Sequence, residues 1–158
     1  MTGETHGLDR ILARHPFFDG MPEGYRVLIQ GCAANAVVKA GDYVYREGEP
    51  ADRFYLIREG RVALEVYVPG RKPIVVDTLG SNELMNWSWL LPPYRCHFDA
   101  RALELTRLIT LDAVCLRAKM DEDPVLGYAV YKRFAPVVAA RLAAARRQLT
   151  DMYGAPGS

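Results

Sequence analysis

The sequence has few of the side chains that build metal sites or disulfide frameworks. It contains three cysteines and three histidines in 158 residues, and the histidines are scattered along the chain. A metal site needs several converging histidine, cysteine or carboxylate ligands, and an odd number of cysteines without regular spacing does not indicate a disulfide framework. We therefore expect no metal, no resident cofactor and reduced thiols in a cytoplasmic protein.

Long apolar runs and an excess of charge are also missing. No segment approaches the roughly 20 apolar residues of a membrane helix, and residues 1–10 lack the basic flank and apolar stretch of a signal peptide. Lys plus Arg is 20 and Asp plus Glu is 19, which leaves a net charge of +1. This balance does not favour nucleic acid or an anionic membrane as a partner.

The side-chain patterns of enzymes are equally sparse. No Gly-x-Ser-x-Gly motif occurs, and no cysteine lies in an activating sequence. Nucleophilic catalysis requires a nucleophile, a base and an orienting group that converge in space. We therefore expect a protein without enzymatic activity.

What the sequence does have is a series of short β-type segments. Residues 35–111 are rich in Val, Ile, Tyr and Phe, and turns that contain Gly or Pro separate the segments at short intervals. This spacing favours an antiparallel barrel or sandwich. Short helices are predicted over 8–14 and 22–31, and 99–111 is predicted to form a final hairpin.

The segment after the strands is predicted to be helical. Asp123-Pro124 offers an N-cap followed by a proline in the first turn, and Pro136 should bend the helix or separate two helices. Apolar residues then follow at spacings of four and three positions, as in a heptad seam: Val138, Leu142, Ala145, Leu149 and Met152.

This heptad seam predicts a homodimer, and packing of the helix on its own β section stays open as the alternative. Arg141, Arg146 and Arg147 flank the seam, and we expect them to be solvated rather than to contact nucleic acid.

One stretch resembles a known family. Residues 41–64 read GDYVYREGEPADRFYLIREGRVAL, and the most specific positions are Gly41, 47–52, 55–57 and Gly60. The stretch is similar to the front half of a cyclic-nucleotide-binding domain of the catabolite activator protein type, and the likeness runs from about Leu8 to about Met152. It implies a mainly β fold with flanking helices: an antiparallel, jelly-roll-like β-roll with short N-terminal helices and a long C-terminal helix.

The resemblance also implies the domain organisation. We expect a single domain over 1–153, with the β-roll at about 35–111, C-terminal helices at about 112–153 and a flexible tail at 154–158. Because the chain ends where the family's DNA-reading domain would begin, nucleic acid is not an expected partner.

The family holds its ligand in a phosphate-binding cassette that resembles Gly-Asp-x-Ile-Gly-Glu-Leu, a short helix and Arg-Ser/Thr-Ala. The helix N-terminus and the arginine hold the cyclic phosphate, and the glutamate binds the ribose hydroxyl. In the best register here, Asn82 and Asn86 stand at the two glycines, and asparagine tolerates left-handed backbone. Trp87 stands at the glutamate, and the arginine position falls near Cys96.

A second register makes Glu83 the ribose ligand and Arg95 the phosphate ligand, but it needs a longer loop. Strand alternation should turn Arg95 to the face opposite Cys96. The site residues that the two registers imply are Glu83, Asn86, Trp87, Ser88, Arg95, Cys96 and His97.

Two functions follow from this altered cassette. In the first, a regulatory or sensory domain binds a cyclic nucleotide or another small anionic ligand between aromatic faces and signals through its C-terminal helix. In the second, Trp87 and Trp89 fill the vacated pocket, and the protein acts in assembly without a ligand.

Overall fold

The computed structural model describes residue 8 and residues 10–153. Within that part of the chain, eight strands are present: β1 Ala33–Val38, β2 Tyr43–Tyr45, β3 Arg53–Glu59, β4 Val62–Val66, β5 Ile74–Leu79, β6 Leu84–Met85, β7 Asp99–Ala102 and β8 Thr106–Asp112. The helical elements are a turn at 10–14, η1 Pro16–Phe18, α2 Glu23–Gln30, η2 Trp87–Leu90, α3 Ala113–Glu122 and α4 Pro124–Tyr153. The expected tail at 154–158 lies outside the described residues.

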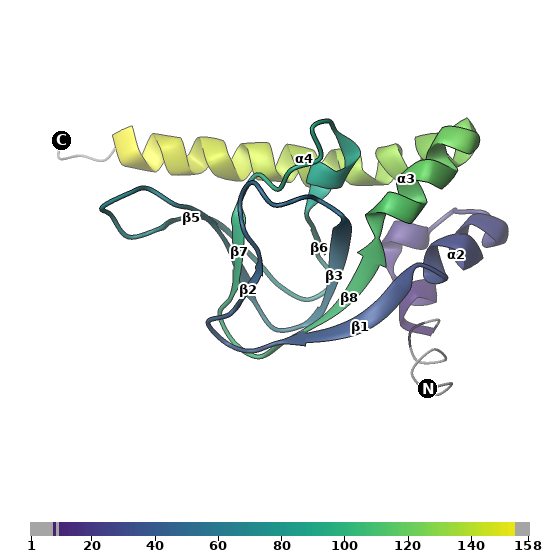
Figure 1. The fold of residues 1–158 in the computed structure, drawn as a ribbon, viewed down its shortest axis with the longest axis horizontal. Coiled ribbons are helices and arrows are strands. Elements are labelled where there is room, and N and C mark those ends of the chain that lie inside the picture. The colour runs from purple at the N-terminus through teal and green to yellow at the C-terminus, as the bar shows by residue number, and fades with distance from the viewer. Residues whose placement is uncertain (1–7, 9, 154–158) are drawn as a thin grey trace.

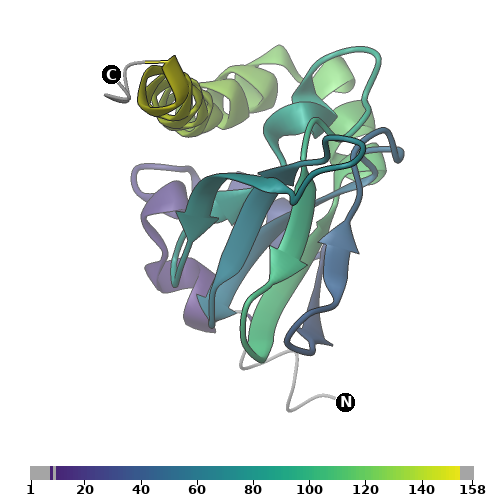
Figure 2. The same ribbon diagram turned by 90° about the vertical axis from the view of Figure 1, so that its left-hand side faces the viewer.

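The strands form two antiparallel sheets that face each other as a roll. Each sheet has four strands, in the orders β1-β8-β3-β6 and β2-β7-β4-β5. Helix α4 runs across one end of the roll, and the N-terminal helices lie beside the first sheet (Figures 1 and 2). The predicted β-roll with short N-terminal helices and a long C-terminal helix is confirmed.

The final hairpin predicted over 99–111 is wrong, because β7 and β8 lie in different sheets. β7 pairs with β4, and β8 pairs with β3. Gly60 lies in the tight turn between β3 and β4. A Cβ atom on Gly60 would lie 2.5 Å from Thr106 Oγ1, so glycine allows the start of β8 to approach this turn. Residues 103–105 therefore carry the chain from one sheet to the other.

One face of β3 packs against the helices. The ring of Phe54 stacks on Trp89 of η2 at 4.8 Å and meets Phe134 of α4 edge-on at 5.1 Å between ring centroids. Phe17 of η1 joins the cluster, 5.7 Å from Phe134. All four rings are buried. The cluster thus holds the roll, η1, η2 and α4 together.

The other face of β3 looks into the roll. Tyr55 follows Phe54 in the strand and therefore points to the opposite side. There it stacks on Tyr45 of β2 at 5.9 Å. Because β2 belongs to the second sheet, this contact crosses the interior of the roll. Both tyrosines are buried, and burial raises the pKa of Tyr55 to about 12.

Helix α4 begins as the sequence predicted. Asp123 Oδ1 accepts hydrogen bonds from the backbone N–H groups of Val125 and Leu126 at 3.1 and 3.3 Å. Pro136 lies inside one continuous helix of 30 residues, so the alternative of two separate helices is wrong. Phe134, before Pro136, and Arg141, after it, are both buried. The helix therefore packs against the roll on both sides of the proline. Among the described helices, none combines the length and apolar character that crossing a bilayer requires.

The heptad seam of α4 faces away from the roll. Leu142, Leu149 and Met152 are 64%, 56% and 50% exposed, and Val138 and Ala145 are half-buried. The roll-facing stripe of α4 instead consists of Phe134, Arg141 and Ala144. Packing on its own β section therefore does not use the seam.

Arg141 was expected to be solvated with Arg146 and Arg147, and for Arg141 this is wrong. Its exposed fraction is only 5%, whereas Arg146 and Arg147 are exposed. The guanidinium lies at the edge of the roll formed by Asp77 of β5 and Leu84 of β6, which we call the roll mouth. These two residues supply a carboxylate and a carbonyl to the buried charge, which satisfies part of its demand for partners.

The two tryptophans should contribute very differently to stability. Trp89 is fully buried in the aromatic cluster, so Trp89→Ala should lower the free energy of unfolding by about 3–5 kcal/mol. Trp87 is half-buried, and Trp87→Ala should cost about 1–2 kcal/mol. Urea denaturation followed by circular dichroism measures both values. Equal losses would contradict the assignment of Trp89 to the core.

Candidate functional site

The predicted cassette (residues 82–97) keeps the backbone path of the family pattern. Asn82 and Asn86, at the two glycine positions, have φ angles of +72° and +76°. Both residues are therefore left-handed, as their position in the pattern predicted. Asn86 is also the N-cap residue of η2. The asparagines thus reproduce the backbone turns that glycine usually provides.

The side chain of Asn86 joins the cassette to the roll. Its Nδ2 donates to the carbonyl of Arg53 at 2.8 Å and lies 3.6 Å from Cys96 Sγ. Its Oδ1 is buried and has no hydrogen-bond partner within the described residues.

Cys96 lies near the arginine position in the first of the two registers. It is 3% exposed. Its backbone N–H donates to the carbonyl of Glu49, and its carbonyl accepts from the backbone N–H of Gly48, both at 2.9 Å. Burial raises the pKa of its thiol to about 11, so the side chain is neutral near pH 7. This position therefore supplies no positive charge to a phosphate.

Arg95 points away from Cys96, as strand alternation requires. Its side chain is exposed and reaches the carbonyl of Gly48 at 3.4 Å. Glu83, the other ligand of the second register, accepts a hydrogen bond from the backbone N–H of Gly80 at 2.7 Å. Arg95 and Glu83 thus each contact a backbone group, at opposite ends of the cassette.

Three other predicted site residues gather on the outer side of the cassette. His97 is exposed, and its ring stacks on Trp87 at 4.6 Å. The Nδ1 atom of His97 lies 2.7 Å from Ser88 Oγ, and Ser88 is buried. The group lacks an acidic residue to orient the histidine, so it does not form a catalytic triad.

The expectation that Trp89 fills the vacated pocket is wrong. Trp89 stacks on Phe54, on the helix-facing side of β3, because η2 inserts this side chain between the sheet and α4. Trp87 packs against the edge of the core and lines an apolar hollow of roughly 430 Å³ next to α4. Tyr45 and Tyr55 stack on each other inside the roll, and the sequence did not indicate this pair.

Three side chains from α3 and α4 donate hydrogen bonds to the cassette backbone, and the sequence did not predict these contacts. Arg141 donates to the carbonyl of Leu84 at 3.1 Å and to Asp77 Oδ2 at 3.3 Å. Tyr131 donates to the carbonyl of Leu90 at 3.0 Å. Arg117 donates to the carbonyl of Trp89 at 2.8 Å.

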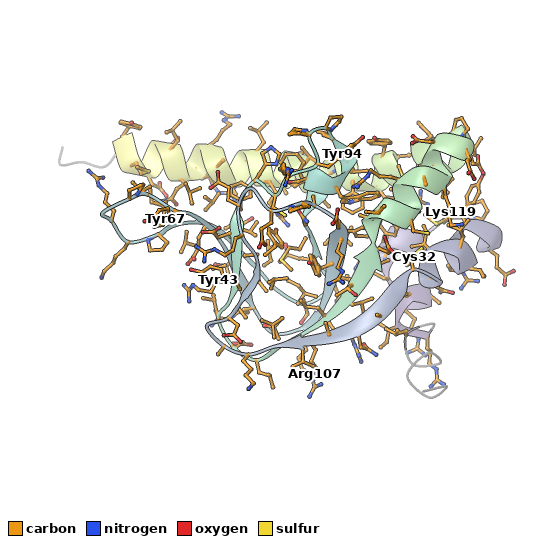
Figure 3. All side chains as sticks on the ribbon, in the orientation of Figure 1. Cys32, Tyr43, Tyr67, Tyr94, Arg107 and Lys119 are labelled. Carbon is orange, nitrogen blue, oxygen red and sulfur yellow. The ribbon has the colours of Figure 1, made fainter. Side chains whose placement is uncertain are left out.

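Tyr94 adds a further contact on the same side of the cassette. Tyr94, which is labelled in Figure 3, has a φ angle of +57°. The Arg117 guanidinium lies over its ring, 4.2 Å from the centroid. Arg117 therefore touches the cassette at both ends of the loop that follows η2.

A sequence signal for Arg141 does exist. The buried positions 134, 141 and 144 of α4 follow a helical spacing of seven and three, and Arg141 is the one charged residue in that stripe. A charged residue at a core-facing position of a helix indicates a buried polar contact.

The residues that the structure describes do not meet the requirements of a metal site. No group of three or more His, Cys, Asp or Glu side chains among them could hold a metal ion.

With this geometry, comparison with known proteins identifies the family. The family profile described as the cyclic nucleotide-binding domain matches residues 36–123. This match covers more than half of the chain, and the chain belongs to that family. The matched range includes the whole cassette and ends at the start of α4.

Individual relatives agree with the family. A CRP-like cAMP-activated global transcriptional regulator of Mycobacterium tuberculosis is 23% identical over 145 residues, which cover 92% of this chain and 63% of that protein. The chain thus spans less than two thirds of this curated relative.

Solved structures share the fold. A putative cyclic nucleotide-binding protein from Geobacter metallireducens has a TM-score of 0.75 and 24% identity, with 85% of this chain and 96% of the other covered. The regulatory domain of Toxoplasma gondii PKA, crystallised with cAMP, has a TM-score of 0.69 and 21% identity, with 83% and 50% covered.

The thiol of Cys96 should make stability depend on pH in the alkaline range. Its pKa is about 11 in the folded protein against an ordinary 9.0, because burial favours the neutral thiol. A raised pKa stabilises the fold below the unfolded pKa, and this stabilisation is lost as the pH rises from about 9 to about 11. Chemical denaturation at several pH values should therefore show a shallower alkaline loss for Cys96→Ala than for the natural protein. Identical slopes would mean that the thiol is not buried in the folded state.

Proposed function

We propose that this chain is a regulatory domain in which the cassette and helix α4 move as one unit, and in which α4 passes the state of the cassette to a second copy of the chain. The observation that carries the proposal is the set of hydrogen bonds from the two C-terminal helices to the carbonyls of Leu84, Trp89 and Leu90. Any ligand that moves η2 must move α4 with it or break these bonds.

The relatives support a regulatory role for the domain. One is a transcriptional regulator and another is the regulatory domain of a kinase. A ligand shifts such a domain only if it binds two arrangements of cassette and α4 with different affinity. Asn86 Oδ1 is buried and accepts no hydrogen bond from the described residues. A buried acceptor without a donor lowers the stability of the fold, which favours a ligand or a water molecule bound at the cassette.

The ligand chemistry is altered relative to the family pattern. A neutral thiol stands where the guanidinium would hold the cyclic phosphate, and an indole stands where a carboxylate would accept the ribose hydroxyl. Aromatic faces and exposed Arg95 and His97 suit a small anionic ligand that stacks.

A second candidate function is assembly without a ligand. The stacked pair Tyr45 and Tyr55 favours it, because these buried rings occupy the interior of the roll. In this case α4 still joins two copies, but the cassette is a fixed part of the core.

Calorimetric titration with cyclic AMP, cyclic GMP and cyclic dinucleotides separates the two functions. The lost acceptor for a buried ribose hydroxyl costs about 1–3 kcal/mol. Cyclic AMP should therefore bind about tenfold to a hundredfold more weakly than to the T. gondii regulatory domain titrated in parallel.

Tight, submicromolar binding of cyclic AMP would contradict the register with Trp87 at the ribose position, and Arg95→Ala would then be expected to abolish it. If none of these cyclic nucleotides gives a heat of binding, the assembly function is favoured.

The homodimer is tested at the heptad seam. Replacing exposed Leu142 and Leu149 with glutamate should give a folded monomer, because the substitutions place like charges at the centre of the seam. The matched control changes Val114 and Val125, which are 51% and 64% exposed outside the seam, to glutamate and should leave the dimer intact. Sedimentation velocity gives the masses. A natural protein that is already monomeric at high concentration rules out the seam as an interface.

A further inference from the structure

A groove lies between η1, the first three cassette residues (82–84) and the middle of α4. Figure 2 shows the N-terminal helices beneath α4 on this side of the molecule. The groove has a volume of roughly 660 Å³, within the ~300–1,000 Å³ range of small-molecule sites. Its apolar wall consists of Pro16, Phe17, Leu84, Pro136, Val137 and Ala140. We call this feature the α4 groove.

Cations on α4 line the same groove. The guanidinium of Arg133 donates to three backbone carbonyls, those of Phe17, Asp19 and Ala129, and it makes no ion pair within the described part of the chain. Lys132 lies next to it and makes no ion pair among the described residues. Its ammonium is 5.8 Å from the ring of Tyr128. Two neighbouring cations therefore lie in the groove lining, and neither is engaged in an ion pair among the residues that the structure describes.

A third cation is built into the floor of the groove. Arg141 is 5% exposed and makes two hydrogen bonds, to Asp77 and to the carbonyl of Leu84. A guanidinium has five N–H donors, so Arg141 keeps donors for a further acceptor. A buried cation with spare donors beside an apolar wall is the arrangement that binds an anionic group on an apolar body.

Two carboxylates, Asp19 and Glu83, also line the groove, and neither forms an ion pair within the part of the chain that the structure describes. Glu83 accepts from the backbone of Gly80, and Asp19 stands at the end of η1. His15 accepts from the backbone N–H of Phe17 at Nδ1, and its Nε2 lies 2.7 Å from the carbonyl of Asn82. These two bonds fit one neutral tautomer. The lining thus holds three cations, Lys132, Arg133 and Arg141, and the two carboxylates of Asp19 and Glu83, while Arg141 is also paired with Asp77.

We propose that the α4 groove binds a small amphipathic organic anion, with one carboxylate or sulfonate on an apolar body. The anionic group lies near Lys132, Arg133 and Arg141, and the apolar body packs on Phe17 and Pro136. This site goes beyond the cassette function and does not depend on it. Since Arg141 also holds Leu84, an anion that bonds to Arg141 acts on the cassette through this contact.

Fluorescence titration with 1-anilinonaphthalene-8-sulfonate, an aromatic body with one sulfonate, tests the proposal. Ala140 is exposed and lines the groove, so Ala140→Trp should fill it and weaken dye binding at least tenfold. Ala143→Trp makes the same change at another exposed position of α4, outside the groove lining, and should change binding less than twofold. Melting temperatures of both variants show whether they remain folded.

The role of charge is tested in the same assay. Octanoate should displace the dye, and octanol, which has the same apolar body without the charge, should need about tenfold higher concentration, the effect of one charge-assisted contact. Exposed Lys132→Ala should weaken octanoate about threefold or more and leave octanol unchanged.

Three results would overturn the proposal. The first is equal dye affinity in the Ala140→Trp and Ala143→Trp variants. The second is equal displacement by octanol and octanoate, which indicates general apolar surface only. The third is no saturable dye binding to the natural protein. None of these results involves cyclic nucleotides, so they leave the proposed cassette function untouched.

Discussion

The contact of Phe54 with Trp89 and Phe134 is the interaction on which the rest of the structure depends. One ring comes from the roll, one from the cassette and one from α4, and their centroids lie 4.8–5.5 Å apart. Buried aromatic rings are worth several kcal/mol each in area alone. The cassette is therefore not a loop that rests on the surface. Its short helix is part of the core, and its position fixes that of α4.

Polar contacts also connect the cassette to the C-terminal helices. Arg141, Tyr131 and Arg117 all donate to backbone carbonyls of the cassette, so the cassette side chains stay available for other contacts. A buried guanidinium with one carboxylate at 3.3 Å is held less firmly than one with a close bidentate partner, such as the Arg101–Glu65 pair at 2.7 Å. The Arg141–Asp77 pair is thus a looser ion pair than the Arg101–Glu65 pair.

The sequence predicted the backbone better than the side-chain environment. Alternating β segments, the Asp123 cap and the left-handed asparagines follow from local rules, because turns, caps and positive φ angles depend on a few neighbouring residues. The sheet to which β8 belongs and the burial of Arg141 depend on contacts between distant segments. Arg141 was misjudged because its neighbours Arg146 and Arg147 are solvated, although the helical spacing from Phe134 placed it on the roll side. Trp89 was assigned to the pocket because local sequence does not reveal which side of β3 η2 faces.

The cassette therefore separates two properties that the family pattern combines. The left-handed turns at Asn82 and Asn86 and the burial of η2 preserve the shape of the cassette. In the register that places Trp87 and Cys96 at the glutamate and arginine positions, we expect the cassette to lack the charges that would recognise a cyclic nucleotide. The shape is held by the same core that positions α4, so a change there would cost stability. Arg95 and His97, by contrast, are exposed, so side chains at these two positions can change while the fold persists. A domain of this kind keeps its connection from cassette to helix even when its ligand differs.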